Sequence, residues 1–165
     1  MTFKKNIVIV GGCGQIGSSF AISLAKMGAN VIIADTNKKL AREIIKEYKN
    51  KNLSFIECDT SDDKSIDKLL IDSKKILNEI DAAIYCAYPR SKEWGKEFET
   101  IKRNYLNQDL NNHLGSSIIF SQKIIKFFLK QKKGNLIHIS SILGISAPKF
   151  QHYQTTNMSS PIEYS

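Results

Sequence analysis

Short apolar runs alternate along the chain with longer segments in which apolar residues recur at helical spacing. The apolar runs predict strands at Asn6–Val10, Val31–Asp35, Leu53–Cys58, Ala82–Cys86 and Leu136–Ser140. Runs that stay apolar throughout, instead of alternating with polar residues, are typical of strands that are buried on both faces.

The segments between the strands predict helices. The first is expected over Ile16–Met27, closed by Gly28, and the second over Lys38–Lys49, with a stripe of Leu40, Ile44, Ile45 and Tyr48. The third carries Ile66, Leu69, Leu70 and Ile76 and is capped by Ser61 or Asp62. A helical region, read as two helices, runs from about Glu97 to Lys132. This alternation predicts an α/β fold with a doubly wound, Rossmann-type parallel sheet.

A chain of 165 residues fits one domain with a sizeable core, so residues 1–165 are interpreted as a single dinucleotide-binding domain. The segment 145–163 differs from the rest because it is polar, turn-prone and long for a loop in a compact domain. Loops of this length are often functional, which favours an insertion at the active site.

Composition narrows the class of protein. The formal net charge is +8, but most of the positive charge is lysine scattered among acidic residues, so we expect no nucleic-acid partner. No apolar run approaches the length that crosses a membrane. Cys13, Cys58 and Cys86 are widely spaced and form no metal-ligand pair, which predicts reduced thiols in a cytoplasmic protein without a metal site.

Gly11, Gly14 and Gly17 follow the first strand at intervals of three residues, where the first helix begins. Glycine is needed where a turn takes a positive φ and where the backbone approaches a diphosphate. Amide groups at the helix start, with the helix dipole, then bind the anion. The loop, including Gln15 and Ile16, therefore predicts a dinucleotide site.

Asp35 ends the second strand, where a carboxylate accepts hydrogen bonds from the adenosine ribose and repels a 2′-phosphate. This favours NAD over NADP. Lys38, Lys39 and Arg42 lie nearby, and one of them could bind a phosphate, so NADP stays open.

Residues after the third and fourth strands are expected at the same crevice, because parallel strands end at one edge of the sheet. Asp59 and Thr60 are candidates for the adenine, although Asp59 could instead only cap a helix. Cys86, Ala87 and Tyr88 follow the fourth strand and are expected to border the nicotinamide half.

These residues together resemble the short-chain dehydrogenase/reductase family. Gly11 and Gly17 match its glycine motif, while Val10 stands in place of the motif's threonine and Gln15 in place of its middle glycine. Gly14 restores the spacing of the extended, sugar-nucleotide-modifying branch. The run from Gly134 to Ser141 is similar to the family's Gly-x-Ile-Val-Asn-Ile-Ser-Ser. The resemblance implies a nicotinamide-dependent oxidoreductase that acts on a small alcohol or ketone and forms homo-oligomers.

The same resemblance implies catalytic residues. Ser141 takes the position of the catalytic serine, and Asn112 that of the helix asparagine, or Asn111 if the register slips by one residue. Tyr164 is favoured over Tyr153 as the catalytic tyrosine, because the fourth residue after Tyr153 is Asn157 rather than lysine. His138 occupies a strand position that is expected to lie next to the core, so it is interpreted as structural.

The segment around Tyr164 looks similar to oxidoreductases of bacterial surface-sugar and flagellin-glycosylation loci, which implies a sugar or sugar derivative as substrate. The family's lysine would lie beyond Ser165, so the chain is expected to be C-terminally truncated, with an exposed last strand, weak cofactor binding and no turnover. The alternatives are a non-catalytic dinucleotide-binding or regulatory protein and an extended-branch epimerase or dehydratase.

Overall fold

A parallel five-stranded sheet forms the centre of the molecule, with the strand order β3-β2-β1-β4-β5. The computed structural model describes residues 3–96, 98–146, 149–153 and 155–156. The strands are β1 (Asn6–Val10), β2 (Asn30–Asp35), β3 (Leu53–Glu57), β4 (Ala82–Tyr85) and β5 (Asn135–His138). The chain winds outward from β1 to β3, returns, and winds the other way through β4 and β5, which confirms the predicted doubly wound Rossmann-type sheet.

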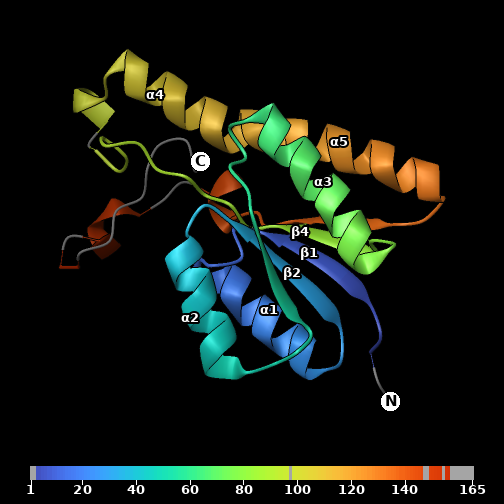
Figure 1. Ribbon diagram of the computed structural model, residues 1–165. Helices are drawn as coiled ribbons and strands as arrows, with labels where there is room; N and C mark the ends of the chain where they lie inside the picture. Colours follow the sequence, from blue (N-terminus) through green and yellow to red (C-terminus); the bar gives the residue numbers. More distant parts are fainter. Residues whose placement is uncertain (1–2, 97, 147–148, 154, 157–165) are drawn as a thin grey trace.

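Helices cover both faces of this sheet (Figure 1). On one face lie α1 (Gln15–Lys26) and α2 (Lys38–Tyr48), and on the other lie α3 (Asp63–Leu77) and α5 (Ser116–Gln131). The short helix α4 (Arg103–Leu110) precedes α5. The remaining helical turns are η1 (Phe98–Thr100), the π-helical turn η2 (Asn111–Gly115), η3 (Ile142–Gly144) and η4 (Phe150–Tyr153).

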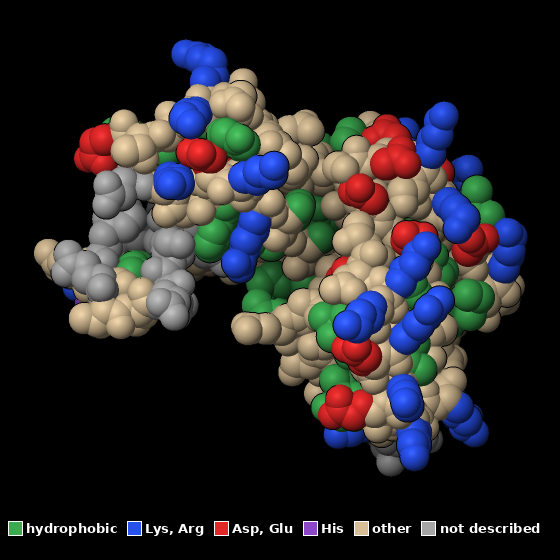
Figure 2. Space-filling view, turned by 60° about the vertical axis from the view of Figure 1, so that its left-hand side comes forward, with side chains coloured by type: hydrophobic (Ala, Val, Ile, Leu, Met, Phe, Trp, Pro, Cys, Tyr) green, Lys and Arg blue, Asp and Glu red, His purple; other side chains and the backbone are tan. Residues whose placement is uncertain are grey.

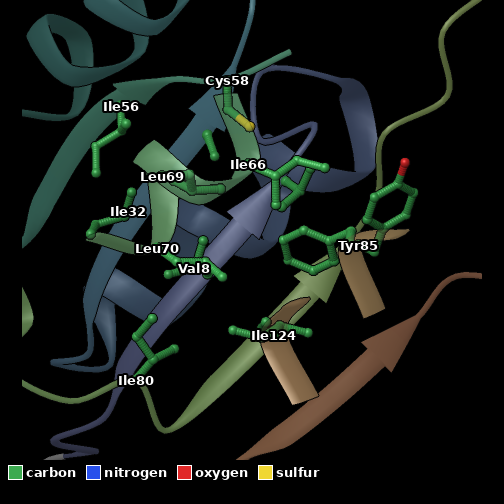
Figure 3. Packing of buried hydrophobic residues seen from close by; sticks show 14 of the residues in the cluster. Val8, Ile32, Ile56, Cys58, Ile66, Leu69, Leu70, Ile80, Tyr85 and Ile124 are labelled. Atoms are coloured by element: carbon green, nitrogen blue, oxygen red, sulfur yellow. The ribbon is translucent and has the colours of Figure 1, made fainter. Parts of the chain in front are cut away.

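Two apolar clusters, one on each face of the sheet, make up the core. Val8 and Ile32 point toward α3 and α5, where Ile66, Leu69 and Ile124 meet them (Figure 3). The next residues along each strand belong to the opposite cluster, which α1 and α2 complete. Because successive strand residues face opposite sides, a strand covered on both faces must be apolar throughout.

Polar residues set the helix starts that the sequence left partly open. The Asn37 side chain accepts a hydrogen bond from the amide of Leu40 at 3.0 Å and begins α2. Asp62, and not Ser61, caps α3 through the amide of Lys64. Capping side chains of this kind satisfy amides that have no partner within the helix.

The region after β4 is a long helical region that contains two α-helices, as predicted, and a π-helical turn that was not predicted. From Arg103 the chain runs through α4, η2 and α5 without a connecting loop, and η2 is a single π-helical turn. The predicted start at Glu97 lies outside the described residues. A π-helical turn inserts extra backbone into a continuous helix, and hydrophobic periodicity does not register that change.

The last strand is shorter than predicted. The expected strand Leu136–Ser140 corresponds to β5 at Asn135–His138, so Ser140 and Ser141 lie beyond it. The reason is that its neighbour β4 ends at Tyr85, whose carbonyl accepts the final bond, from the amide of Ile139 at 3.4 Å. Within the described residues β5 is an edge of the sheet.

Charged side chains are spread over the surface. In the view of Figure 2, lysine and arginine side chains are interspersed with aspartate and glutamate over α3 and its surroundings. Several are paired, for example Lys123 with Asp67 at 2.7 Å and Lys75 with Asp72 at 2.8 Å. No helix among residues 3–96, 98–146 and the short described stretches after them is long and apolar enough to span a membrane.

Phe120 tests the core packing. It is fully buried in α5 against the sheet, so Phe120→Ala is expected to lower the free energy of unfolding by about 3–5 kcal/mol, because a cavity replaces the ring. The control Ile71→Ala removes a side chain that is 56% exposed on α3 and is expected to cost less than about 1 kcal/mol. Urea titration measures both, and equal costs would contradict this packing.

Candidate functional site

A cleft of about 800 Å³ lies at the carboxyl ends of the strands. Its lining includes every residue predicted to bind the dinucleotide, namely Gly11, Gly14, Gln15, Ile16, Gly17, Asp35, Asp59, Thr60, Cys86 and Ala87. It also includes Tyr88, which the sequence placed with Cys86 and Ala87, and residues that the sequence did not single out, among them Pro89, Arg90, Trp94 and Leu143. The fold thus brings residues that follow each of the five strands into one cavity.

The turn after β1 has no room for side chains at two of its glycines. Gly11 has φ +72°, and a Cβ there would lie 2.5 Å from the backbone nitrogen of Ala87. At Gly17 a Cβ would lie 2.3 Å from the carbonyl oxygen of Gly11. Gly12, which the spacing argument passed over, is also packed closely, because its Cβ would lie 2.9 Å from the Ile9 carbonyl.

Gly14 has a different role from its neighbours. Its φ is −67° and a Cβ would meet only the Gly11 carbonyl, at 3.3 Å. It is the N-cap residue of α1, and no side chain of the described residues caps that end of the helix. Within this part of the chain the first amides of α1 therefore have no side-chain acceptor, and the adjoining residues Gln15, Ile16 and Gly17 line the cleft. Such a helix start can bind an anion.

The Asp35 carboxylate is held at the edge of this turn by two backbone amides. Oδ2 accepts a hydrogen bond from Cys13 at 3.0 Å, and Oδ1 accepts one from Asn37 at 2.9 Å. A carboxylate has about four acceptor positions, so both oxygens keep capacity for hydroxyl donors of a ligand. Asp35 is half-buried and lines the cleft.

The cations near Asp35 take positions away from the cavity. Lys38 forms an ion pair with Glu57 at 2.7 Å. Lys38, Lys39 and Arg42 are exposed, and none belongs to the described lining of the cleft. The charge beside the turn is therefore that of the Asp35 carboxylate.

Asp59 and Thr60 lie at the end of β3. Asp59 Oδ1 accepts hydrogen bonds from the amide and the hydroxyl of Ser61, at 2.9 and 2.7 Å, and its own amide donates to Ser65. Asp59 does not cap α3, because the N-cap residue of that helix is Asp62. Thr60 is buried and completes this part of the wall.

The cysteines that reach the cleft are unreactive thiols. Burial, with a further contribution from the Asp35 charge, raises the pKa of Cys13 to about 12. Burial also raises the pKa of Cys58 and of Cys86 to about 11. All three are free thiols, and with these values they stay protonated and non-nucleophilic near neutral pH.

The candidate catalytic residues lie at the β4 and β5 side of the sheet. Ser141 is half-buried and begins η3, where its Oγ accepts a hydrogen bond from the Leu143 amide at 3.1 Å. Tyr153 is half-buried and lines the cleft together with Leu143. Tyr164, the tyrosine that the sequence favours, lies outside the described residues, as does most of the segment 145–163.

The asparagine candidates lie in the π-helical turn η2. Asn111 is exposed, and its Oδ1 lies 3.0 Å from the position that a Cβ on Gly115 would take. Asn112 is half-buried. Neither asparagine, nor Ser141, belongs to the described lining of the cleft. π-Helical turns are frequent at functional sites, which makes η2 the feature of this region to test.

His138 does not enter the cleft in the described structure. Its ring lies 5.6 Å from that of Tyr85, and its Nε2 makes a hydrogen bond of 2.9 Å with the hydroxyl of Ser121. It is more exposed than its predicted place beside the core suggested. The contacts join β5 to β4 and α5.

Comparisons with known proteins agree with this architecture. The family model for short chain dehydrogenases matches residues 5–158. The post-translational flagellin modification protein A of Campylobacter coli is 35% identical over 170 residues, covering 100% of this chain and 66% of that protein. A 7alpha-hydroxysteroid dehydrogenase of Bacteroides fragilis is 26% identical over 146 residues, covering 87% of this chain and 56% of that protein.

Solved structures share the fold. A short chain dehydrogenase from Leptospira borgpetersenii with bound NAD+ superposes with a TM-score of 0.82 at 24% identity, covering 99% of this chain and 59% of that one. Another, from Bacillus anthracis, has a TM-score of 0.79 at 24% identity, covering 88% and 59%. The chain thus spans less than two thirds of the length of each of these proteins.

Substitutions at Gly17 and Gly14 test how closely the start of α1 packs against the turn after β1. Helix propensity alone predicts that Gly17→Ala stabilises the protein by about 1 kcal/mol. The contact with the Gly11 carbonyl predicts instead a loss of about 1–3 kcal/mol. In Gly14→Ala the Cβ would lie 3.3 Å from the same carbonyl, a contact that a small shift relieves, so the free energy of unfolding is expected to change by less than about 1 kcal/mol. Urea titration of both variants decides, and a stabilising Gly17→Ala would contradict the described turn.

Proposed function

Because this chain belongs to the short-chain dehydrogenase family, we propose that it forms the cofactor-binding part of an oxidoreductase. The reaction is the transfer of a hydride between a nicotinamide dinucleotide and a small alcohol or ketone. The observation that carries this proposal is the cleft, in which the uncapped start of α1, Asp35 and Asp59 share one wall. The Leptospira relative of the same fold, which holds NAD+, supports the choice of cofactor.

In this proposal each part of the cleft contacts one part of the dinucleotide. The amides of the first turn of α1, from Gln15 to Gly17, bind the diphosphate above Gly14. Asp35 accepts hydrogen bonds from the adenosine ribose, and Asp59 with Thr60 borders the adenine. Cys86 and Ala87, after β4, border the nicotinamide half.

We propose NAD rather than NADP as the cofactor. A 2′-phosphate on the ribose would meet the Asp35 carboxylate, whose oxygens already accept from Cys13 and Asn37 and which therefore stays in place. The cation that follows β2 most closely, Lys38, is held by Glu57. Repulsion by a fixed carboxylate without a compensating cation disfavours the phosphate.

The chemistry that we propose requires a proton donor and a group that orients the substrate. Nicotinamide, when bound, supplies or receives the hydride. Ser141 donates a hydrogen bond to the substrate oxygen, and Tyr164 donates or accepts the proton. Asn112, or Asn111, holds a water in the proton relay from its place in η2. Asn112 fits this role better because it is half-buried while Asn111 is exposed.

The proposed substrate is a sugar or a sugar derivative. Similarity to a flagellin modification protein supports this class. That these 165 residues alone turn over nothing stays a prediction, which the rate of NADH consumption tests. A non-catalytic dinucleotide-binding role is the second candidate, favoured by the position of Ser141 outside the described lining of the cleft.

We further propose a homo-oligomer in the cytoplasm. Leu114, Ile118, Ile125 and Leu129 form an exposed apolar stripe along η2 and α5, which supports association. The free thiols support a reducing compartment.

Trp94 gives a direct test of the cofactor proposal, because it is the only tryptophan of the chain and lines the same cleft as Gly14. Bound NADH is expected to quench Trp94 emission by energy transfer, and the quenching is expected to saturate as NADH is added.

Asp35→Asn tests the choice between NAD and NADP. The substitution removes the repelling charge, so the preference for NADH over NADPH is expected to fall by about tenfold or more.

Glu43→Gln is the matched control, since it removes an exposed carboxylate of α2 that does not line the described cleft. It is expected to leave the ratio of the two affinities unchanged within about twofold. Absence of saturable quenching by NADH would rule out the proposed cofactor site. An unchanged ratio in Asp35→Asn would remove the argument for NAD.

A further inference from the structure

The loop after β4 places an exposed cation, Arg90, on two aromatic rings that line the cleft. The guanidinium of Arg90 lies 4.1 Å from the ring centre of Trp94 and 5.9 Å from that of Tyr88. All three residues line the cleft. The indole nitrogen of Trp94 also donates a hydrogen bond to the Tyr88 hydroxyl at 3.2 Å. An arginine held over rings keeps its N–H donors, which lie in the plane of the guanidinium, for other partners.

Contacts with α4 and η2 hold this loop in place. On one side of Arg90, the His113 ring stacks on Tyr88 with 3.9 Å between ring centres and its Nε2 contacts the Pro89 carbonyl. On the other side, Ser91 donates two hydrogen bonds to Asp109, from its amide at 2.8 Å and from its hydroxyl at 2.7 Å. Asp109 is itself buried. Arg90 is thus positioned by fixed neighbours and not by a loose loop.

The positive charge of Arg90 is not neutralised within the described part of the chain. Among the described residues of the same loop, the acidic residue is Glu93, which pairs with Lys102 at 3.7 Å, and Asp109 of α4 is occupied by Ser91. The carboxylates in the described lining of the cleft, Asp35 and Asp59, follow β2 and β3 on the far side of β1. The cleft therefore carries negative charge on the side of β2 and β3 and positive charge on the side of β4.

We propose that Arg90 determines specificity by binding an anionic oxygen group of the substrate, a carboxylate or a phosphate. Trp94 and Tyr88 contact the carbon skeleton beside that group. This inference rests on the proposed oxidoreductase function, which assigns the β2 and β3 side to the cofactor. An anionic substrate is attracted by Arg90 and repelled by Asp35 and Asp59, so it enters in one orientation. A guanidinium suits either anion because it can donate two parallel hydrogen bonds.

The test uses Trp94 emission as a local reporter of binding, with NAD+ present at saturation. The probes are glucose 6-phosphate, glucuronate and glucose, with inorganic phosphate to measure the bare anion. At least one anionic sugar is expected to bind about tenfold tighter than glucose, as charge-assisted bonds do. The stronger of the two anionic probes identifies whether phosphate or carboxylate is the preferred group. If neither exceeds glucose, the inference is overturned.

Substitutions assign the effect to Arg90. Arg90→Gln is expected to remove the tenfold preference, and Arg90→Lys, which keeps the charge without the planar fork, to retain part of it. Lys92→Gln is the matched control, because Lys92 is an exposed cation of the same loop outside the described lining. It is expected to change no affinity by more than about twofold. Equal losses in Arg90→Gln and Lys92→Gln would reduce the effect to general charge and overturn the inference.

NADH affinity, followed by the emission of the nicotinamide itself, separates this inference from the proposed function. If the unsubstituted protein fails to bind NADH, the cofactor proposal fails. If NADH binds but no anionic sugar is preferred, only the role of Arg90 fails. If Arg90→Gln weakens NADH binding as much as sugar binding, Arg90 contacts the cofactor and the inference is overturned.

Discussion

The close approach of the first turn to the end of β4 is the constraint on which the rest of the cleft depends. Gly11 lies so near the backbone of Ala87 that a single methyl group would collide with it. Gly17 is equally close to the Gly11 carbonyl, so α1 begins directly above β1. This packing brings an uncapped helix start to the point where the sheet reverses its winding direction. Ligands of doubly wound sheets bind at such points.

The sequence predicts the architecture and the cofactor side of the cleft for the same physical reason. Strands buried on both faces leave continuous apolar runs, so β1 is predicted with its observed bounds and the residues that follow β1, β2, β3 and β4 are expected to meet. The cleft does gather Gly14, Asp35, Asp59 and Ala87, although their ligand contacts remain proposals.

Most of the β4 side of the cleft was missed because it depends on the fold of one loop and on the contacts of that loop with a later helix. The spacing of Arg90 and Trp94 does not show that the guanidinium lies on the indole, or that His113 and Asp109 hold the loop. The rule that strand ends meet at the cleft could have extended the candidates from Tyr88 to Arg90. The adjacent Asn111 and Asn112 could not be ranked from sequence, because their difference in burial follows from a π-helical turn that hydrophobic spacing does not reveal.

Charge and packing divide the cleft into two sides. Asp35 and Asp59 are held by amides and hydroxyls of neighbouring turns, while Arg90 is held by rings. In the proposed function, η2 connects the Arg90 side with the proton relay, since His113 contacts the Arg90 loop and its neighbour Asn112 is the proposed relay residue. A substrate bound at Arg90 would then lie beside the elements that carry the proposed proton transfer.

The proposed function requires that amides at the start of α1 bind a diphosphate. In a titration of the ¹⁵N-labelled protein with NAD+, we expect the amide chemical shifts of Gln15, Ile16 and Gly17 to change most, together with those of Cys13 and Asn37, which donate to Asp35. If these amides stay unchanged while NAD+ shifts residues elsewhere, the dinucleotide does not bind at this turn, which would contradict the proposed site.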